Sequence, residues 1–377
     1  MIKYVGVNDR ITKLFEGQFI IPEGISYNSY VILDDKVVVM DSVDVKFADL
    51  WLANIDAALD GKNVDYLIVD HMEPDHSASL DKFVLKYPNA VLVGNNKTFN
   101  MLNNFFPNLK YQSLVVNDGD ELDLGHDKLK FVMTPMVHWP EVMMSYLKNE
   151  KVLFSADAFG KFGALDFDDP EGWACEARRY YFGIVGKFGA FVQKALQKLS
   201  AFEINAIYPL HGPVLDDNLS YYLGLYDTWS KYEPEKKGTV IFSASVYGHT
   251  HKACEELYDR LEGTKELMDL LDEDIYECVE SAFEYSKIVL SSITYNSGIF
   301  PKVEEFINLL LERGYKNRTI AIIENGSWGP MARKQIVAKF ENVDVTILDE
   351  KVTLKSALNA ESLKEIEVLA DKLNSIE

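Results

Sequence analysis

The sequence predicts an α/β protein in which a layered domain of mixed strands and helices precedes a doubly wound sheet of five parallel strands. Its 377 residues exceed one ordinary domain, because about 150 residues per domain is typical. A polar stretch, 231–238, separates two segments that are rich in apolar residues. Beyond it, short apolar strands alternate with amphipathic helices, as in a parallel sheet. We therefore expect two domains, residues 1–235 and 236–377.

Strands and a hairpin come early in the first domain. The apolar runs Ser29–Leu33 and Lys36–Met40 flank two aspartates, which predicts a hairpin with a tight polar turn. The other expected elements are helix Phe47–Leu59, strand Asp65–Val69, helix Ser79–Leu85, strands Ala90–Val93, Leu129–Met133 and Lys151–Phe154, helix Arg179–Leu199, strand Asn205–Tyr208 and helix Asn218–Tyr232. This mixture favours an α/β layer fold over a simple doubly wound sheet.

The second domain alternates strictly between strands and helices. The expected strands are Thr239–Phe242, Lys265–Leu270, Ile288–Leu290, Thr319–Ile323 and Asp344–Leu348. The expected helices are Thr250–Leu261, Glu273–Phe283, Lys302–Arg313, Pro330–Phe340 and Ala360–Asn374. Five parallel strands with crossover helices in this length have the size and order of a flavodoxin-like domain, which binds ligands beyond the carboxyl ends of its strands.

Composition narrows the classes of function. Lys and Arg number 38 against 59 Asp and Glu, so the net charge of −21 disfavours nucleic acid and anionic membranes as partners. No apolar run approaches the roughly 18 residues of a membrane span, and the first residues lack the pattern of a secretory signal. The three cysteines are scattered (Cys175, Cys254 and Cys278), which excludes a disulfide framework and a four-cysteine iron site. We expect a cytoplasmic protein that holds any metal through histidines and carboxylates.

Six consecutive residues after a predicted strand contain two histidines and two carboxylates. In an extended segment alternate side chains point the same way, so His71, Glu73 and Asp75 are expected to converge while His76 reaches a second point. Pro74 is expected to keep this segment from being helical. The alternative is a solvated loop in which Asp75 caps the next helix.

Three further polar residues, His138, Asp157 and His211, each follow another predicted strand in apolar or Gly/Pro surroundings. Each one alone would more often be a structural residue than a ligand. Because they recur at the same topological position as the six-residue cluster, we expect them to gather with it in one pocket.

The combined set exceeds the needs of one metal ion and suits two metals bridged by a carboxylate. Two divalent ions would bring four positive charges against three carboxylates, and a bridging hydroxide would balance the remainder. Nitrogen and hard oxygen ligands without thiolates suit iron or manganese, and zinc less well. The seven expected ligands are His71, Glu73, Asp75, His76, His138, Asp157 and His211.

The cluster resembles the signature of the metallo-β-lactamase superfamily, but Glu73 stands where the zinc hydrolases carry a second histidine. With that departure, the sequence resembles the flavodiiron proteins, also called A-type flavoproteins, over essentially the whole chain. The motifs that carry the resemblance are Ser26-Tyr-Asn-Ser-Tyr30, Asp75-His76, His138-Trp-Pro140, Ser155-Ala-Asp-Ala-Phe-Gly160 and His211-Gly212. It implies a metallo-β-lactamase-like αβ/βα sandwich followed by a flavodoxin-like domain.

The resemblance also implies roles for individual residues. One iron ion would be held by His71, Glu73 and His138, and the other by Asp75, His76 and His211. Asp157 and an oxo or hydroxo ligand would bridge the two ions, with a diatomic molecule bound between them. From their positions beside the motifs, Tyr27, Trp139 and Phe159 are expected in the pocket wall. An additional carboxylate, Glu73, favours higher oxidation states and therefore redox chemistry over hydrolysis.

A second candidate site lies where strand Thr239–Phe242 runs into the next helix. Small hydroxyl residues and Gly248 in this loop let backbone N–H groups approach a phosphate, and the helix dipole favours the negative charge. The loop contains neither GxxxxGK[ST] nor GxGxxG, which disfavours nucleoside triphosphate and dinucleotide sites. It also lacks Lys and Arg, which indicates a phosphate held by neutral donors, although an ordinary helix cap uses the same residue types.

Two later loops, 292–298 and 325–329, follow strands that should be neighbours in the same sheet. Tyr295 and Trp328 could line an isoalloxazine ring, and the choice between them stays open. The resemblance implies an FMN site formed by Ser245, Val246, Tyr247, Gly248, His249, Thr250, Thr294, Tyr295, Asn296, Gly298, Asn325, Gly326, Ser327, Trp328 and Gly329. A zinc site at His249 and His251 is an alternative, but we interpret both as loop and helix-start residues.

The expected activity is an FMN- and diiron-dependent reduction of dioxygen to water with four electrons. Reduction of nitric oxide to nitrous oxide at the same site is the alternative. A dinuclear zinc hydrolase with a flavodoxin-like module is disfavoured by Glu73, and an electron carrier that lost its metal chemistry is disfavoured by the complete ligand set. No rubredoxin or flavin-reductase module follows the second domain, so we expect a separate donor such as rubredoxin or a reduced deazaflavin. The resemblance implies a head-to-tail homodimer or a tetramer.

Overall fold

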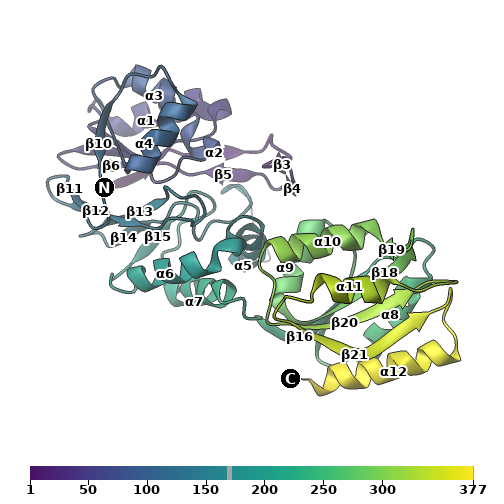
Figure 1. Cartoon of the computed structure of the whole chain (residues 1–377). Coiled ribbons are helices and arrows are strands. Elements are labelled where there is room, and N and C mark those ends of the chain that lie inside the picture. Colours follow the sequence, from purple (N-terminus) through teal and green to yellow (C-terminus); the bar gives the residue numbers. More distant parts are fainter. Residues whose placement is uncertain (168–171, 377) are drawn as a thin grey trace. The chain divides into compact units, whose positions relative to one another are not determined.

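The computed structural model describes residues 1–167 and 172–376 and divides the chain into two compact units, Met1–Asp227 and Thr228–Glu377. Each unit combines sheets with covering helices (Figure 1). The predicted α/β class is therefore confirmed. The first unit is a sandwich of two sheets between helices, and the second is a parallel sheet with helices on both faces.

Two sheets form the centre of the first unit. The six-stranded sheet runs β1 (Ile2–Tyr4), β6 (Tyr30–Leu33), β7 (Val37–Met40), β8 (Tyr66–Ile68), β9 (Val91–Gly94) and β10 (Gln112–Val115). The five-stranded sheet runs β11 (Glu121–Asp123), β12 (Lys128–Met133), β13 (Met143–Leu147), β14 (Val152–Phe154) and β15 (Ala206–Tyr208). Two short antiparallel pairs lie outside these sheets: β2 (Val7–Asp9) with β5 (Ile25–Tyr27), and β3 (Leu14–Phe15) with β4 (Phe19–Ile20).

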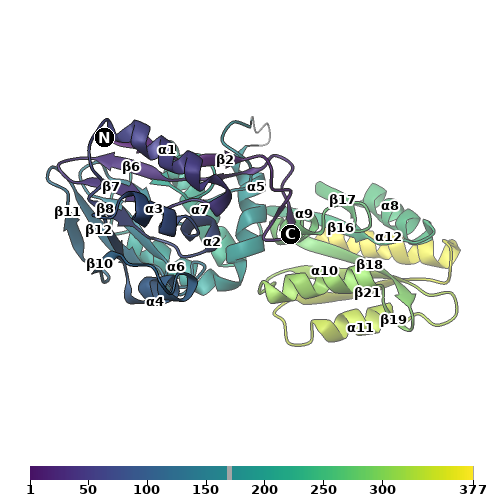
Figure 2. The ribbon, with the colours of Figure 1, turned by 90° about the horizontal axis from the view of Figure 1, so that it is seen from above.

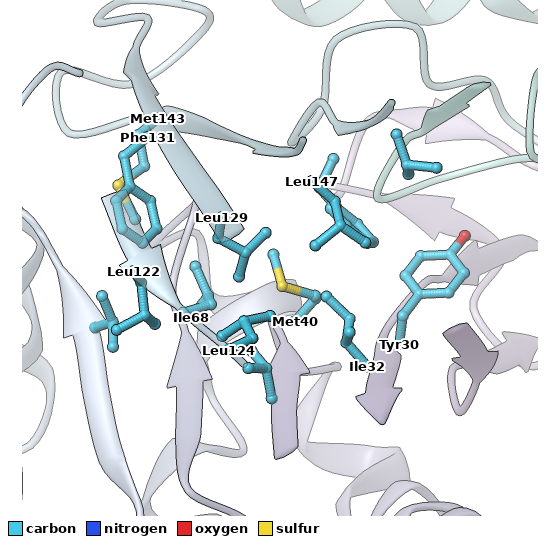
Figure 3. Close-up of a cluster of buried hydrophobic side chains, with 14 of the residues drawn as sticks. Tyr30, Ile32, Met40, Ile68, Leu122, Leu124, Leu129, Phe131, Met143 and Leu147 are labelled. Carbon is cyan, nitrogen blue, oxygen red and sulfur yellow. The ribbon is translucent and has the colours of Figure 1, made fainter. Parts of the chain in front are cut away.

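Apolar side chains from both sheets make one core. Ile32, Met40 and Ile68 of the six-stranded sheet lie opposite Leu129 and Leu147 of the five-stranded sheet (Figure 3). Helices α1 (Ala48–Leu59), α3 (Leu80–Lys86) and α4 (Asn96–Phe105) cover the outer face of the six-stranded sheet, and α6 (Gly189–Leu199) lies against the other sheet. Because β7 is therefore covered on both faces, its four residues are all buried, as its continuous apolar run requires.

The predicted helix Arg179–Leu199 is wrong as a single element. Helix α5 (Trp173–Tyr180) ends near the start of this range. A π-helical segment (Tyr181–Val185) and a 3-10 turn (Gly186–Phe188) follow, and α6 begins after them. Glycines at 183, 186 and 189 weaken a regular helix here. A Cβ on Gly183 would lie 2.7 Å from the ring of Phe19, so close packing explains the glycine at that position.

Other elements also differ from the expectation. The sequence patterns missed helix α4. They also missed most of the short strands, because strands of two to five residues carry little periodicity. The strand predicted over Asp344–Leu348 is the longer β21 (Thr346–Leu354). Regular structure begins inside the polar stretch, at Lys236 of β16 (Lys236–Ser243), and α7 (Leu219–Ser230) precedes it.

The second unit has the strand order of a flavodoxin-like domain, as predicted. Its parallel strands run β17 (Thr264–Asp269), β16, β18 (Tyr285–Tyr295), β20 (Thr319–Asn325) and β21, with the short β19 (Gly298–Ile299) paired to β18. Helices α8 (His249–Arg260) and α12 (Ala360–Ser375) pack on one face, while α9 (Ile275–Glu284), α10 (Pro301–Glu312) and α11 (Ala332–Lys339) lie on the other (Figure 2). The order 2-1-3-4-5 creates a switch point where ligands bind.

Arg318 is a buried cation that binds backbone carbonyl oxygens from two segments of the second unit. Its guanidinium donates to the carbonyl oxygens of Tyr232, at 2.5 Å, and Phe283, and it is 3% exposed. We expect Arg318→Met to lower the free energy of unfolding by about 3 kcal/mol, because buried carbonyls lose charge-assisted bonds. Urea unfolding should show this loss.

The matched control is Arg260→Met, because Arg260 makes an exposed ion pair with Glu256. An exposed pair of this kind contributes about 0.5 kcal/mol. Equal stability of the two variants would contradict the assignment of Arg318.

In the part of the chain that the structure describes, none of the helices has the length and apolar character that crossing a membrane requires.

Candidate metal centre and cofactor cavity

Four segments from distant parts of the first unit meet at one end of its two sheets. Residues 71–76 follow β8, and His138 lies in the connection between β12 and β13. Asp157 follows β14, and His211 follows β15. All seven residues predicted as ligands thus come together, and their nitrogen and oxygen atoms form two groups.

The first group comprises His71, Glu73, His138 and Asp157, whose ligand atoms all lie within 4.8 Å of one another. Oε2 of Glu73 is 3.2 Å from Nε2 of His71 and 3.0 Å from Nε2 of His138. The second group comprises Asp75, His76 and His211. There the two Nε2 atoms are 3.0 Å apart, and Oδ2 of Asp75 lies 3.2 Å and 3.3 Å from them.

Asp157 lies between the two groups with one carboxylate oxygen toward each. Its Oδ2 is 3.1 Å from Nε2 of both His71 and His138. Its Oδ1 is 3.4 Å from Nε2 of His76 and 3.6 Å from Nε2 of His211. One buried carboxylate therefore faces both sets of imidazoles.

Two expectations about the six-residue cluster are wrong. His71, Glu73 and Asp75 do not converge on one point, because Asp75 belongs to the second group. Pro74 does not prevent a helix, since a short helix, α2 (Pro74–Ser77), begins at this residue. Proline is well tolerated at the first helical position, where its missing N–H has no partner to lose. The helical turn after Glu73 sends Asp75 and His76 toward His211.

The orientation of the imidazoles suits metal binding through Nε2. Nδ1 of His71 lies 2.9 Å from Oε1 of Glu141, and Nδ1 of His211 lies 2.7 Å from the carbonyl oxygen of Ser26. Such partners fix the proton on Nδ1 and leave the Nε2 lone pair for a metal ion. Glu141 was not predicted, since nothing in the sequence near Trp139 distinguishes it from a surface carboxylate.

Unpaired buried atoms provide an independent test of the fit. Oδ1 of Asp75 is buried and makes no hydrogen bond, and Oδ2 of Asp75 and Oδ1 of Asp157 face only imidazole nitrogens. A buried carboxylate oxygen without a partner is costly unless a cation neutralises it. Nitrogen and carboxylate donors arranged in two groups therefore fit a pair of hard or borderline metal ions, such as iron.

Charge pairing sets the pKa values of the metal-free site. Burial by itself would lower the pKa of His76, but the charges of Asp75 and Asp157 outweigh it and raise this pKa to about 10. Burial also opposes protonation of His138, yet hydrogen bonds to Asp157 and Glu73 raise its pKa to about 9. Burial favours a neutral Asp157, but the charge of His71 and its hydrogen bonds hold the Asp157 pKa well below its usual range.

We expect the uptake of Fe²⁺ by the metal-free protein at pH 7 to release protons. His76 and His138, with pKa values of about 10 and 9, are protonated at that pH and must lose their protons to bind a metal. The apparent affinity should therefore rise as the pH increases from 7 towards 9. Calorimetry in buffers of different ionisation enthalpy measures the protons released, and binding without proton release would contradict the charge assignment.

Aromatic side chains lie beside both groups of ligands. The rings of Tyr27 and His211 are 5.8 Å apart, and Tyr27 is also 6.2 Å from His76. Trp139 packs edge-on against His71, with ring centroids 5.4 Å apart. Phe159 is buried and stacks on Tyr226, with ring centroids 4.1 Å apart.

Three neighbours of the site were not found from the sequence. Tyr180 and Phe15 have their rings 5.4 Å and 5.6 Å from His211. Glu16, in the turn between β3 and β4, approaches Glu73, and partial burial with the charge of Glu73 raises its pKa to about 7. These residues lie on segments without a motif, so only the fold brings them to the imidazoles.

The second unit contains a cavity of about 430 Å³ at the carboxyl ends of its strands. Its walls come from the loops after β16, β18 and β20, where the sequence predicts cofactor binding. Of the fifteen predicted residues, all but Gly248 and Gly298 line it. The structure adds Ile293, Ser297 and Ser356, the last from a fourth loop after β21.

Asn325 connects these loops from beneath the cavity. Its side-chain Nδ2 donates to Oγ1 of Thr250 at 3.1 Å and to the carbonyl oxygen of Ser356 at 2.9 Å. Its Oδ1 accepts from the backbone N–H of Ser356 at 3.1 Å. The start of α8 and the loop after β21 are thereby held together. Trp328, by contrast, is 97% exposed at the rim, so the structure leaves the choice between Tyr295 and Trp328 open.

The fold and the two sites define a two-domain protein, in which a metallo-β-lactamase-like domain with paired groups of potential metal ligands precedes a flavodoxin-like domain. A family model described as "ODP family beta lactamase" matches residues 25–212. An uncharacterized protein of Methanocaldococcus jannaschii is 29% identical over all of this chain and 97% of its own length. The anaerobic nitric oxide reductase flavorubredoxin of Vibrio vulnificus is 27% identical over 90% of this chain and 71% of its own length.

Solved structures extend the similarity to both domains. The flavodiiron protein of Giardia intestinalis superposes with a TM-score of 0.92 at 29% identity, covering 99% of this chain and 94% of that one. The rubredoxin oxygen:oxidoreductase of Desulfovibrio gigas shares the fold, with a TM-score of 0.92 at 23% identity over 99% of this chain and 96% of that one. In sequence and in fold, the chain is thus similar to the flavodiiron proteins over both of its domains.

Proposed function

We propose that this protein is an oxidoreductase that reduces dioxygen to water with electrons from an external carrier. Residues 1–235 would hold a diiron site and residues 236–377 would bind FMN. One dioxygen molecule takes up four electrons and four protons and yields two water molecules. In the diiron site His71, Glu73 and His138 would bind one ion, and Asp75, His76 and His211 the other, with Asp157 and an oxo or hydroxo ligand between them.

The observation that carries this proposal is the position of Asp157 between two groups of ligand atoms, with Oδ2 3.1 Å from two imidazoles and Oδ1 3.4 Å from a third. Glu73 occupies the first group, where it adds a negative charge. Extra negative charge stabilises more highly charged iron and therefore favours redox chemistry over hydrolysis.

When bound, FMN would accept electrons from the carrier and an iron pair would offer open positions for a small gas. The chain's own residues shape the site around such a gas. Tyr27 turns its hydroxyl away toward Asp9, at 3.4 Å, so that its ring faces the imidazoles of the second group. The ring of Trp139 covers one side of the His71 imidazole. These apolar faces exclude bulky substrates and limit the access of water.

Reduction of nitric oxide is the second candidate, because the Vibrio vulnificus relative carries that activity in its name. Two molecules of nitric oxide with two electrons and two protons would give nitrous oxide and water at the same site. The donor would be a separate carrier, such as rubredoxin, which the name of the Desulfovibrio gigas protein mentions, or a reduced deazaflavin. We also propose a homodimer, head to tail, or a tetramer.

Metal and flavin analysis together with anaerobic kinetics tests the proposal. The purified protein should contain iron and FMN, and reduced rubredoxin should be oxidised faster by dioxygen than by nitric oxide, without release of hydrogen peroxide. A faster reaction with nitric oxide that yields nitrous oxide would support the second candidate. A zinc-filled site with hydrolytic turnover would refute both.

A further inference from the structure

Asn28, at the centre of the motif Ser26-Tyr-Asn-Ser-Tyr30, is fully buried beside the metal centre without being one of its proposed ligands. It directly follows β5. A buried carboxamide needs hydrogen-bond partners. The partners of Asn28 lie in residues 209–212, the loop that follows β15 and carries His211.

One residue thus binds three of the four carbonyl oxygens of this loop. The side-chain Nδ2 of Asn28 donates to the carbonyl oxygen of Pro209 at 2.8 Å and to that of Gly212 at 2.7 Å. Its backbone N–H donates to the carbonyl oxygen of Leu210 at 2.8 Å. Two carbonyl oxygens require two N–H donors on one short side chain, which an asparagine amide provides and an ionised aspartate does not.

Ser26 completes the contacts between the two segments. Its carbonyl oxygen lies 2.7 Å from Nδ1 of His211, and its Oγ accepts from the backbone N–H of Gly212 at 2.8 Å. Gly212 has a φ of 81°, and a Cβ there would lie 2.6 Å from Cγ of Lys161. Because the loop bends sharply in this confined space, the hydrogen bonds from residues 26–28 fix where the imidazole of His211 lies.

The two groups of ligands differ in how their imidazoles are supported. In the first group, Nδ1 of His71 lies 2.9 Å from Oε1 of Glu141. In the second group, Nδ1 of His76 is buried and has no hydrogen-bond partner among residues 1–167 and 172–376. His211 is therefore the imidazole of the second group that a contact at Nδ1 orients, and its place depends on the loop that Asn28 binds.

We propose that Asn28 is a positioning residue for the second metal position, which depends on it more strongly than the first position does. The inference rests on the proposed function insofar as two iron ions occupy the two groups. It goes further because it assigns the geometry of one of the two positions to a residue that contacts neither ion.

The test titrates the metal-free protein with Fe²⁺ under anaerobic conditions and counts the bound ions by native mass spectrometry. Asn28→Ala removes both side-chain donors and leaves all seven proposed ligands in place. The matched control is Asn54→Ala, because Nδ2 of Asn54 also donates to two carbonyl oxygens, those of Val5 at 3.2 Å and Gly6 at 3.1 Å. Ser26→Ala is a milder variant, since it removes one acceptor of the loop and keeps the carbonyl oxygen beside His211.

We expect Asn28→Ala to bind one ion as the wild-type protein does and the other about 10- to 100-fold more weakly, the range for loss of a group that orients a metal ligand. Ser26→Ala should weaken the same ion by less, and Asn54→Ala should bind both ions normally. Combining Asn28→Ala with Glu141→Leu, which removes the partner of His71, should leave neither ion tightly bound, because each substitution acts on a different group.

The inference fails if Asn28→Ala binds both ions normally or weakens both equally, if Asn54→Ala has the same effect, or if the double variant keeps one tightly bound ion. A residue that only stabilised the fold would affect both ions alike. If circular dichroism shows that Asn28→Ala does not fold, Ser26→Ala decides by the same criteria. In all these cases a wild-type protein that binds two iron ions leaves the proposed function intact, whereas one that binds fewer refutes the proposed diiron site as well.

Discussion

Replacing Asp157 with alanine is expected to reduce the gas-reducing activity by at least about 100-fold and to lower the iron content, while FMN remains bound. Asp157 is 1% exposed and lies within 3.6 Å of four imidazole nitrogens, so no solvent-exposed group can take its place. Loss of a residue that only supports a metal ligand already costs about 10- to 100-fold. The cavity proposed for FMN is lined by residues 245–356 only, and it should therefore be unaffected.

Asp49→Ala is the matched control, because the side chain of Asp49 is 88% exposed and pairs only weakly with Lys82. Iron by mass spectrometry, flavin absorbance and turnover are measured on both variants. Asp157→Asn separates the loss of charge from the loss of volume. If Asp157→Ala retained full iron content and full turnover, the assignment of a shared carboxylate would be wrong.

Replacing Glu141 with leucine is expected to weaken iron binding by about 10- to 100-fold, although Glu141 is not among the proposed ligands. Its Oε1 lies 2.9 Å from Nδ1 of His71 and accepts the backbone N–H of Met72 at 2.9 Å. Leucine leaves both donors buried without an acceptor, so His71 loses its fixed orientation. Glu141→Gln should have a smaller effect, because the amide oxygen can still accept from both groups.

Titration of the metal-free variants with Fe²⁺ measures these affinities, and circular dichroism confirms that they fold. Glu121→Gln is the control, since Glu121 forms an exposed pair with Lys148 at 2.8 Å. An affinity of Glu141→Leu equal to that of the control would show that the orientation of His71 does not depend on this carboxylate.

The second domain was predictable because its pattern is long and regular. Strand β20 contains the continuous apolar run Ile320–Ile323, and the helices between the strands repeat apolar residues at helical spacing. The first domain was less predictable, because β3 and β4 have two residues each and acquire their conformation from packing. Likewise, the glycine at position 183, in the π-helical segment between α5 and α6, is explained by the close approach of Phe19, which is far away in the chain.

The seven proposed metal ligands could be selected from the sequence because their residue types are rare and follow strands. Local spacing placed Asp75 with His71 and Glu73, whereas the resemblance to the flavodiiron proteins placed it with His76 and His211, and the helical turn at Pro74 brings it there. The residues that support these ligands and the cavity were not predicted, for a related reason. Glu141 and Ser356 look like ordinary polar residues, and only their distances to His71 and to Asn325 reveal what they do.

The sequence by itself determined the α/β class, the flavodoxin-like order of the second domain and the identity of the candidate ligands. These properties depend on local periodicity and on residue chemistry, and both can be read directly from the order of the residues. The tertiary structure decided the distances between the ligand atoms and which residues outside the motifs support them, such as Glu141 beside His71 and Ser356 beside Asn325. Such relations depend on distances of a few ångströms between segments that can be more than a hundred residues apart, and no local pattern encodes those distances.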